Sequence, residues 1–143
     1  MLFEKRDRQK NIDRGVLKLK HEESQIQQAF IQWCNLHINK YPELKFIHHS
    51  PNGGKRNVKE AARFKREGVK AGFPDLILPV VTSTNAGLYI EVKTKNGRLS
   101  SSQKEWKDFL ISQGYSWKLC RSLKECIEAV KLHLDPYEIL PFE

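Results

Sequence analysis

The chain has little cysteine, and none of it follows a pattern typical of a metal site or a disulfide framework. Its 143 residues include three cysteines, Cys34, Cys120 and Cys126, which is an odd number with no C-x-x-C spacing. This argues against a secreted domain held together by disulfides and against a zinc knuckle. It is consistent with a protein of a reducing compartment. We expect the three thiols to be buried and to pack as small apolar groups.

Long apolar runs are missing as well. No stretch approaches the roughly 20 apolar residues that a membrane helix needs. The first residues, MLFEKRDRQKNIDRG, lack the apolar core of a signal peptide. We therefore expect a cytoplasmic protein that is neither secreted nor inserted in a membrane. The nucleotide-binding pattern G-x-x-x-x-G-K-[ST] is also absent, so any ATP-driven helicase would be a separate partner.

Negative charge is scarce relative to positive charge. Lys and Arg number 25 and Asp and Glu 17, which gives a formal net charge of +8. This surplus favours a polyanionic partner, and nucleic acid is the first candidate, although many small basic proteins are only generically adhesive. The length and a hydrophobic content of 39% suit one domain with a single core.

Composition divides the chain into a central domain and two extensions. Residues 1–21 are polar and basic, and we expect a mobile arm or a short extension docked on the body. Residues 22–134 carry the patterns of a folded domain. The tail, residues 135–143, is apolar but interrupted by prolines, so it needs a surface of this chain or of a partner.

Helices and strands are expected to alternate through the central domain. Apolar spacing predicts helices over 22–36, 57–67, 102–114 and 122–134, and strands over 44–49, 76–81, 88–94 and 115–119. Capping boxes are expected at Ser102 with Glu105 and at Ser122 with Glu125. The order predicts an α/β domain with a mixed central sheet flanked by helices.

The helix predicted over 57–67 has two different faces. Val58, Ala61 and Ala62 are expected to face inward. Five cations share an arc of about 100° on the wheel: Lys55, Arg56, Lys59, Arg63 and Arg66. A charged face is often merely solvated, yet we predict that this one contacts phosphates. Asn52, in the preceding Pro-Asn-Gly-Gly loop, either makes the turn or touches the DNA backbone with Lys55 and Arg56.

The segment from Gly72 to Lys93 carries the residues most suited to catalysis. Asp75 opens one predicted strand, and Glu91-Val92-Lys93 lies on the next. Because side chains alternate along a strand, Glu91 and Lys93 share one face while Val92 anchors the strand in the core. A hairpin would bring Asp75 near Glu91. These two carboxylates and a backbone carbonyl, which we assign to Val92, would give Mg²⁺ or Mn²⁺ the oxygen ligands it prefers.

This set of groups suits the hydrolysis of a phosphodiester. A bound metal would polarise the phosphoryl oxygen and lower the pKa of a bound water. Lys93 would orient that water or stabilise developing negative charge. A Glu–Lys pair on an exposed strand is common and means little alone. Together with Asp75 and the basic helix, it favours a metal-dependent DNA nuclease.

Pro74-Asp75 and Glu91-x-Lys93 resemble the signature of the PD-(D/E)XK nuclease superfamily. More narrowly, the chain is similar over about residues 22–130 to the virus-type replication-repair nuclease (VRR-NUC) family. The stretches that carry the resemblance are Glu23-x-x-Ile26-Gln27, Pro51-Asn52-Gly53-Gly54-Lys55-Arg56, Gly68-Val69-Lys70-Ala71-Gly72-Phe73-Pro74-Asp75-Leu76, Glu91-Val92-Lys93 and Leu99-Ser100-x-x-Gln103.

The resemblance implies a restriction-endonuclease-like αβββαβ core, dependence on Mg²⁺ or Mn²⁺, and cleavage of branched DNA. Short stand-alone members, from phages or bacteria, are similar to Holliday-junction-resolving enzymes that act as homodimers. A two-fold dimer would match the near two-fold symmetry of a four-way junction. The competing hypotheses are a non-catalytic, structure-selective DNA-binding module and a nuclease of flap or restriction type.

Carried over by motif, Glu23 is a further acidic residue of the site, reaching the metal directly or through water, with Glu22 as its rival. The plain alternative for Glu23 is a carboxylate favoured by the dipole at a helix N-terminus. Gln103 matches a position beside the metal, and ordinary first-turn helix chemistry is its alternative. His48 and His49 are expected to be strand residues near the site.

Overall fold

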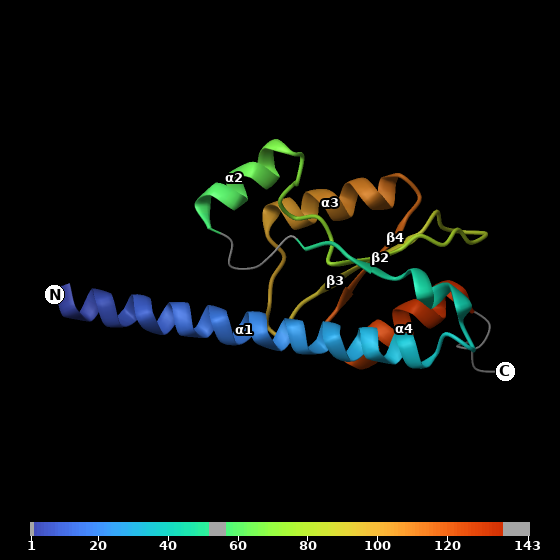
Figure 1. The fold of residues 1–143 in the computed structure, drawn as a ribbon, viewed down its shortest axis with the longest axis horizontal. Coiled ribbons are helices and arrows are strands. Elements are labelled where there is room, and N and C mark those ends of the chain that lie inside the picture. Colours follow the sequence, from blue (N-terminus) through green and yellow to red (C-terminus); the bar gives the residue numbers. More distant parts are fainter. Residues whose placement is uncertain (1, 52–56, 136–143) are drawn as a thin grey trace.

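The structure, a computed structural model, describes residues 2–51 and 57–135. Its helices are α1 (Leu2–Leu36), the 3₁₀ helix η1 (Pro42–Phe46), α2 (Val58–Arg66), α3 (Ser101–Ser112) and α4 (Leu123–Leu134). Its strands are β1 (His48–His49), β2 (Leu76–Leu78), β3 (Leu88–Val92) and β4 (Ser116–Cys120). The predicted α/β class, a mixed sheet flanked by helices, is confirmed (Figure 1).

The sheet has the order β1-β2-β3-β4. β2 pairs antiparallel with β1 and with β3, and Leu76 lies opposite Ile90. β4 runs parallel to β3, which requires a crossover, and α3 makes that connection. The predicted hairpin of the second and third strands is therefore present, and it places the first residue before β2 beside the end of β3.

The two faces of the sheet carry two separate hydrophobic clusters. On one face Leu88, Ile90 and Val92 pack with Phe30 of α1 and Val130 of α4. On the other, Tyr89 and Trp117 pack with Leu110 of α3. Figure 1 shows α1 and α4 on one side of the strands and α3 on the other. Val92 is thus buried in the core, as predicted. The three cysteines are free and buried, as also predicted.

The first helix is longer than predicted. It begins at Leu2 rather than at Glu22, so residues 2–21 are helical and continuous with the rest of α1. Their Lys, Arg, Gln and Leu residues have high helix propensity even without an apolar stripe to signal it. The N-terminal part of α1 projects beyond the rest of the molecule in Figure 1. Glu23 lies in the middle of this helix, so the dipole at a helix N-terminus does not explain why a carboxylate stands there.

Two local predictions were wrong. The strand expected over 44–49 is reduced to His48–His49, because Pro42 at the start of η1 favours a helical turn and buries Leu44 there. Val58 is 86% exposed and no residue of α2 is buried. This short helix makes its inward contact through the half-buried Phe64 rather than through Val58, Ala61 or Ala62.

The helix caps differ in detail from the predicted ones. The capping box of α3 pairs Ser100 with Gln103, two residues before the predicted pair of Ser102 and Glu105. Ser122 caps α4 as predicted, but the carboxylate of Glu125 accepts a hydrogen bond from the amide of Arg121. None of the helices within the described residues is long and apolar enough to cross a membrane.

Candidate active site

Asp75 is fixed between two strands at the start of the hairpin. Its Oδ2 accepts a hydrogen bond of 2.7 Å from the backbone N–H of Val92 on β3. Its backbone carbonyl accepts a 2.9 Å hydrogen bond from the amide of Ser50 and lies 2.8 Å from Nδ1 of His49. The carboxyl group is therefore held against the end of β3. His49 lies near the site, as expected for a strand residue.

Glu91 lies beside Asp75 and is almost completely buried, with 3% of its surface exposed. Its Oε1 accepts a hydrogen bond of 2.8 Å from Nε2 of Gln103. The other end of that amide, Oε1 of Gln103, accepts from the backbone N–H of Ser100 at 2.8 Å. Gln103 therefore acts both as part of the helix cap and as a donor to Glu91, and its place beside a bound metal stays a prediction.

The carboxyl groups of Asp75 and Glu91 lie within hydrogen-bonding distance of each other. Burial, and then the charge of Asp75, raises the pKa of Glu91 to about 8. Burial also raises the pKa of Asp75, although the Val92 amide opposes that shift. Two adjoining carboxylates repel each other, and this repulsion adds to burial in favouring a protonated Glu91.

Lys93 and Glu23 have opposite effects on the pKa of Glu91. The ammonium group of Lys93 lowers the pKa of both carboxyls, and the negative charge of Glu23 raises that of Glu91. Glu23 is seven residues before the buried Phe30, so the two share the face of α1 that packs on the sheet. Of the two acids weighed on this helix, Glu23 is thus the one whose charge reaches Glu91.

The oxygen atoms present fit a small divalent cation. Mg²⁺ is commonly held by one or two carboxylates, with waters completing its octahedron. Asp75 and Glu91 supply two adjoining carboxylates. In the described part of the chain, no three or more His, Cys, Asp or Glu side chains form a ready-made metal cluster. The site therefore offers the two carboxylates of Asp75 and Glu91 to a cation, and the carboxylate of Glu23 does not form a three-ligand cluster with them.

The turn before Asp75 approaches the start of α3 closely. Gly72 has φ +83°, and a Cβ atom there would lie 2.5 Å from the carbonyl carbon of Ser102 and 2.7 Å from the amide nitrogen of Gln103. Trp106 reinforces this contact by donating a 3.0 Å hydrogen bond from Nε1 to the carbonyl of Ala71. No sequence pattern signals this role of Gly72, which brings Gln103 within reach of Glu91.

Replacing Gly72 should destabilise the protein more than the same change at another glycine in the left-handed region. We expect Gly72→Ala to cost about 3 kcal/mol, because backbone strain and a clash with backbone atoms add together. Gly114→Ala is the matched control, since Gly114 has φ +88° with nothing within 4 Å of its Cβ position. It should cost about 1 kcal/mol. Urea denaturation of both variants measures the difference, and equal losses would contradict the close approach.

A second residue missed in the sequence holds the loop that follows Lys93. Nη1 of Arg121 donates hydrogen bonds to the carbonyls of Thr94, Lys95 and Gly97. One guanidinium thus provides hydrogen-bond donors for three backbone carbonyls of the loop that follows β3. Nothing in the sequence around Arg121 distinguishes it from an ordinary surface arginine.

The cations expected to contact DNA lie on α2 where the structure describes them. Lys59, Arg63 and Arg66 are exposed. Arg63 makes a 3.7 Å ion pair with Glu67, and both side chains are more than half exposed, so the pair contributes little stability. Asn52, Lys55 and Arg56 lie outside the described residues. Whether this face contacts phosphates stays a prediction.

Comparisons with known proteins agree with this arrangement. The model of the VRR-NUC domain family matches residues 13–124. A solved structure titled "VRR_NUC domain protein" is 32% identical, with a TM-score of 0.67 over 80% of this chain and 88% of its own. The search of curated proteins gives no match. The family match and the folded relative together place this chain in the VRR-NUC domain family, whose members are DNA-processing nucleases.

Proposed function

We propose that the protein is a Mg²⁺- or Mn²⁺-dependent endonuclease that hydrolyses phosphodiester bonds in branched DNA. The observation that carries this proposal is the contact between the carboxyl group of Asp75 and that of the buried Glu91. Each is oriented by its own donor, the Val92 amide and the Gln103 side chain. A pair of acids built in this way is costly in a fold unless a cation is bound there.

Asp75, Glu91 and the carbonyl of Val92 would hold the metal, and Glu23 would reach it directly or through water. The N–H and C=O of one strand residue point to the same side, so the Val92 carbonyl faces the side on which its amide meets Asp75. When bound, the ion would polarise the phosphoryl oxygen and acidify a water. Binding requires Glu91 to lose its proton, and Lys93 favours that loss.

Lys93 would then orient the attacking water and stabilise negative charge that develops on the phosphate. It shares the strand face of Glu91, because the two are separated by one residue. The exposed cations of α2 would hold the DNA backbone without reading sequence. We further propose that the enzyme cuts four-way junctions as a homodimer, in which two sites would act on the two symmetric strands.

Cleavage assays on defined DNAs test this proposal. Labelled four-way junctions, flaps, splayed arms and plain duplex would be incubated with Mg²⁺, Mn²⁺ or EDTA, and the mass of the protein would be measured by sedimentation. We expect cleavage of branched DNA with either metal, none in EDTA, and a two-chain mass. Equal binding with and without metal, and no cleavage of any DNA, would instead favour a non-catalytic binding module.

A further inference from the structure

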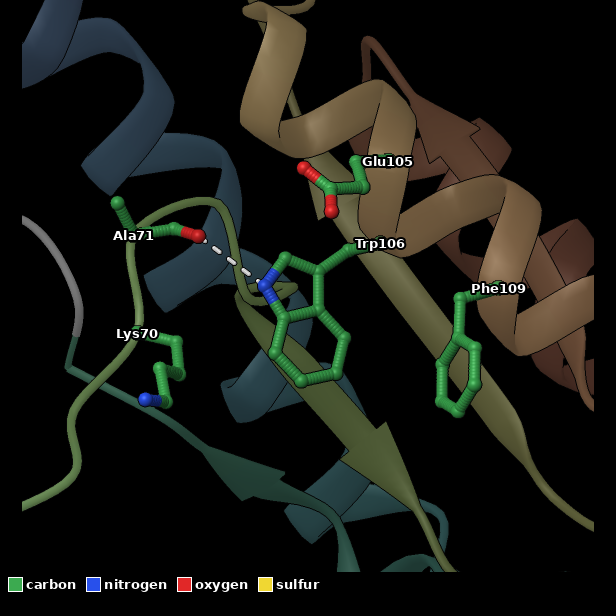
Figure 2. A pocket seen from close by; sticks show the side chains of 5 residues that line it. All are labelled: Lys70, Ala71, Glu105, Trp106 and Phe109. Atoms are coloured by element: carbon green, nitrogen blue, oxygen red, sulfur yellow. Dashed lines mark hydrogen bonds between the residues drawn. The ribbon is translucent and has the colours of Figure 1, made fainter.

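An aromatic groove lies beside the candidate active site. Its first part has a volume of about 440 Å³ and is lined by Lys70, Ala71, Glu105, Trp106 and Phe109. Figure 2 shows the indole of Trp106 at its centre, with the Lys70 ammonium on one side and the Phe109 ring on the other. The second part shares Trp106 and Lys70 and extends towards Phe64, Phe73, Val69, Gly68, Pro51 and Ser50.

The rings of this groove are held in place but not covered. Trp106 is fixed by its hydrogen bond to Ala71 and by an edge-to-face contact with Phe73, whose ring centroid is 4.9 Å away. Phe109 stands 6.3 Å from Trp106, also edge to face, and is 54% exposed. A preorganised, open aromatic surface is suited to stacking a planar group.

The groove is joined to the carboxylate pair through Ser50 and through α3, which carries both Trp106 and Gln103. Ser50, which lines it, donates its amide hydrogen to the carbonyl of Asp75. Trp106 lies one helical turn after Gln103, the donor to Glu91. A DNA strand whose phosphate reaches Asp75 and Glu91 would therefore pass the mouth of the groove, and an unpaired nucleotide on it could enter.

The charges of the groove favour a base over a phosphate. Lys70 lines the groove and can contact a phosphate of the DNA backbone at its rim. The carboxylate of Glu105 would repel a phosphate placed inside the groove. The same carboxylate can accept a hydrogen bond from the N–H groups on the edge of a base. We infer that this groove binds an unpaired base of the DNA substrate by stacking on Trp106 and Phe109. The inference rests on the proposed function to the extent that it takes DNA as the substrate.

The inference can be tested without cleavage. The probe is a splayed-arm DNA with 2-aminopurine at the first unpaired position, and a fully paired duplex with the same base is its comparison, both in EDTA. Stacking on the rings should quench the 2-aminopurine when the splayed DNA binds. Phe109→Ala should lose most of that quenching and weaken splayed-arm binding by about tenfold, as expected for one stacked base. Duplex binding should change less than twofold.

Ile111→Ala is the matched control, because Ile111 is on the same helix, is 49% exposed and is not among the groove residues. It should bind and quench like the parent. Unchanged quenching in Phe109→Ala, or equal weakening for both DNAs, would overturn the inference. A lower mass of Phe109→Ala in sedimentation would also overturn it, by assigning the groove to contact between copies. Because the binding assay contains no metal, it is independent of cleavage. A protein that never cuts DNA could still bind the unpaired base in this groove, and a protein that cuts DNA could fail to bind it there.

Discussion

Asp75→Asn, Glu91→Gln and Lys93→Ala are each expected to lower the rate of DNA cleavage by at least about 10³-fold, while DNA affinity in EDTA stays within about twofold. Asp75→Asn can still accept the Val92 amide and Glu91→Gln can still accept from Gln103, so the fold is retained. What each change removes is a charge that would act on the metal or on the reacting phosphate. Single-turnover cleavage of a labelled junction measures the effect.

Matched controls separate this effect from a general loss of charge. Asp108→Asn on α3 and Lys95→Ala, two residues after Lys93, alter exposed side chains of the same types. Both should cleave at close to the parental rate. Strong residual cleavage by all three site variants would refute the assignment of roles, and equal losses in the controls would point to electrostatic binding rather than catalysis.

The second large effect is on stability. In metal-free buffer we expect Glu91→Gln to be about 4 kcal/mol more stable than the parent at pH 8, with little difference near pH 4.5. The folded protein holds a proton on Glu91 up to about pH 8, whereas the unfolded chain releases it near the ordinary value of 4.5. Between these values the folded state binds more protons, so the stability of the parent falls as pH rises, by up to about 1.4 kcal/mol per unit.

Thermal unfolding at several pH values in EDTA measures this difference, which corresponds to about 8–16 °C at pH 8. Glu43→Gln, an exposed acid on η1, is the control and should follow the parent. Adding Mg²⁺ should raise the transition temperature of the parent at pH 8, because binding to the folded state alone stabilises it. It should do so less for Glu91→Gln. A parent whose stability does not fall between pH 5 and 8 would contradict a protonated, buried Glu91.

The sequence predicted the parts of this structure that depend on local alternation. Strand periodicity placed Val92 in the core, and the short loop after β2 predicted the hairpin that brings Asp75 to β3. These strand features can be predicted because they follow from a repeat of two residues. Gln103 became a candidate through the family resemblance instead, and the predicted capping box was placed two residues too late.

The remaining features depend on contacts between distant segments. The closeness of Gly72 to Gln103 and the three carbonyl groups bound by Arg121 join residues about 30 positions apart or in different layers. Propensity alone did not extend α1 back to Leu2, because its polar residues carry no clear apolar stripe.

The burial of every cysteine makes this chain convenient for spectroscopy. Burial raises the pKa of Cys34 to about 12, and contact with Cys126 together with burial raises that of Cys120, so native thiols react slowly. A cysteine introduced at exposed Ser83, in the loop between β2 and β3, would therefore take up a maleimide dye selectively. Energy transfer between copies carrying donor and acceptor dyes would then report whether two chains associate and how DNA changes their separation.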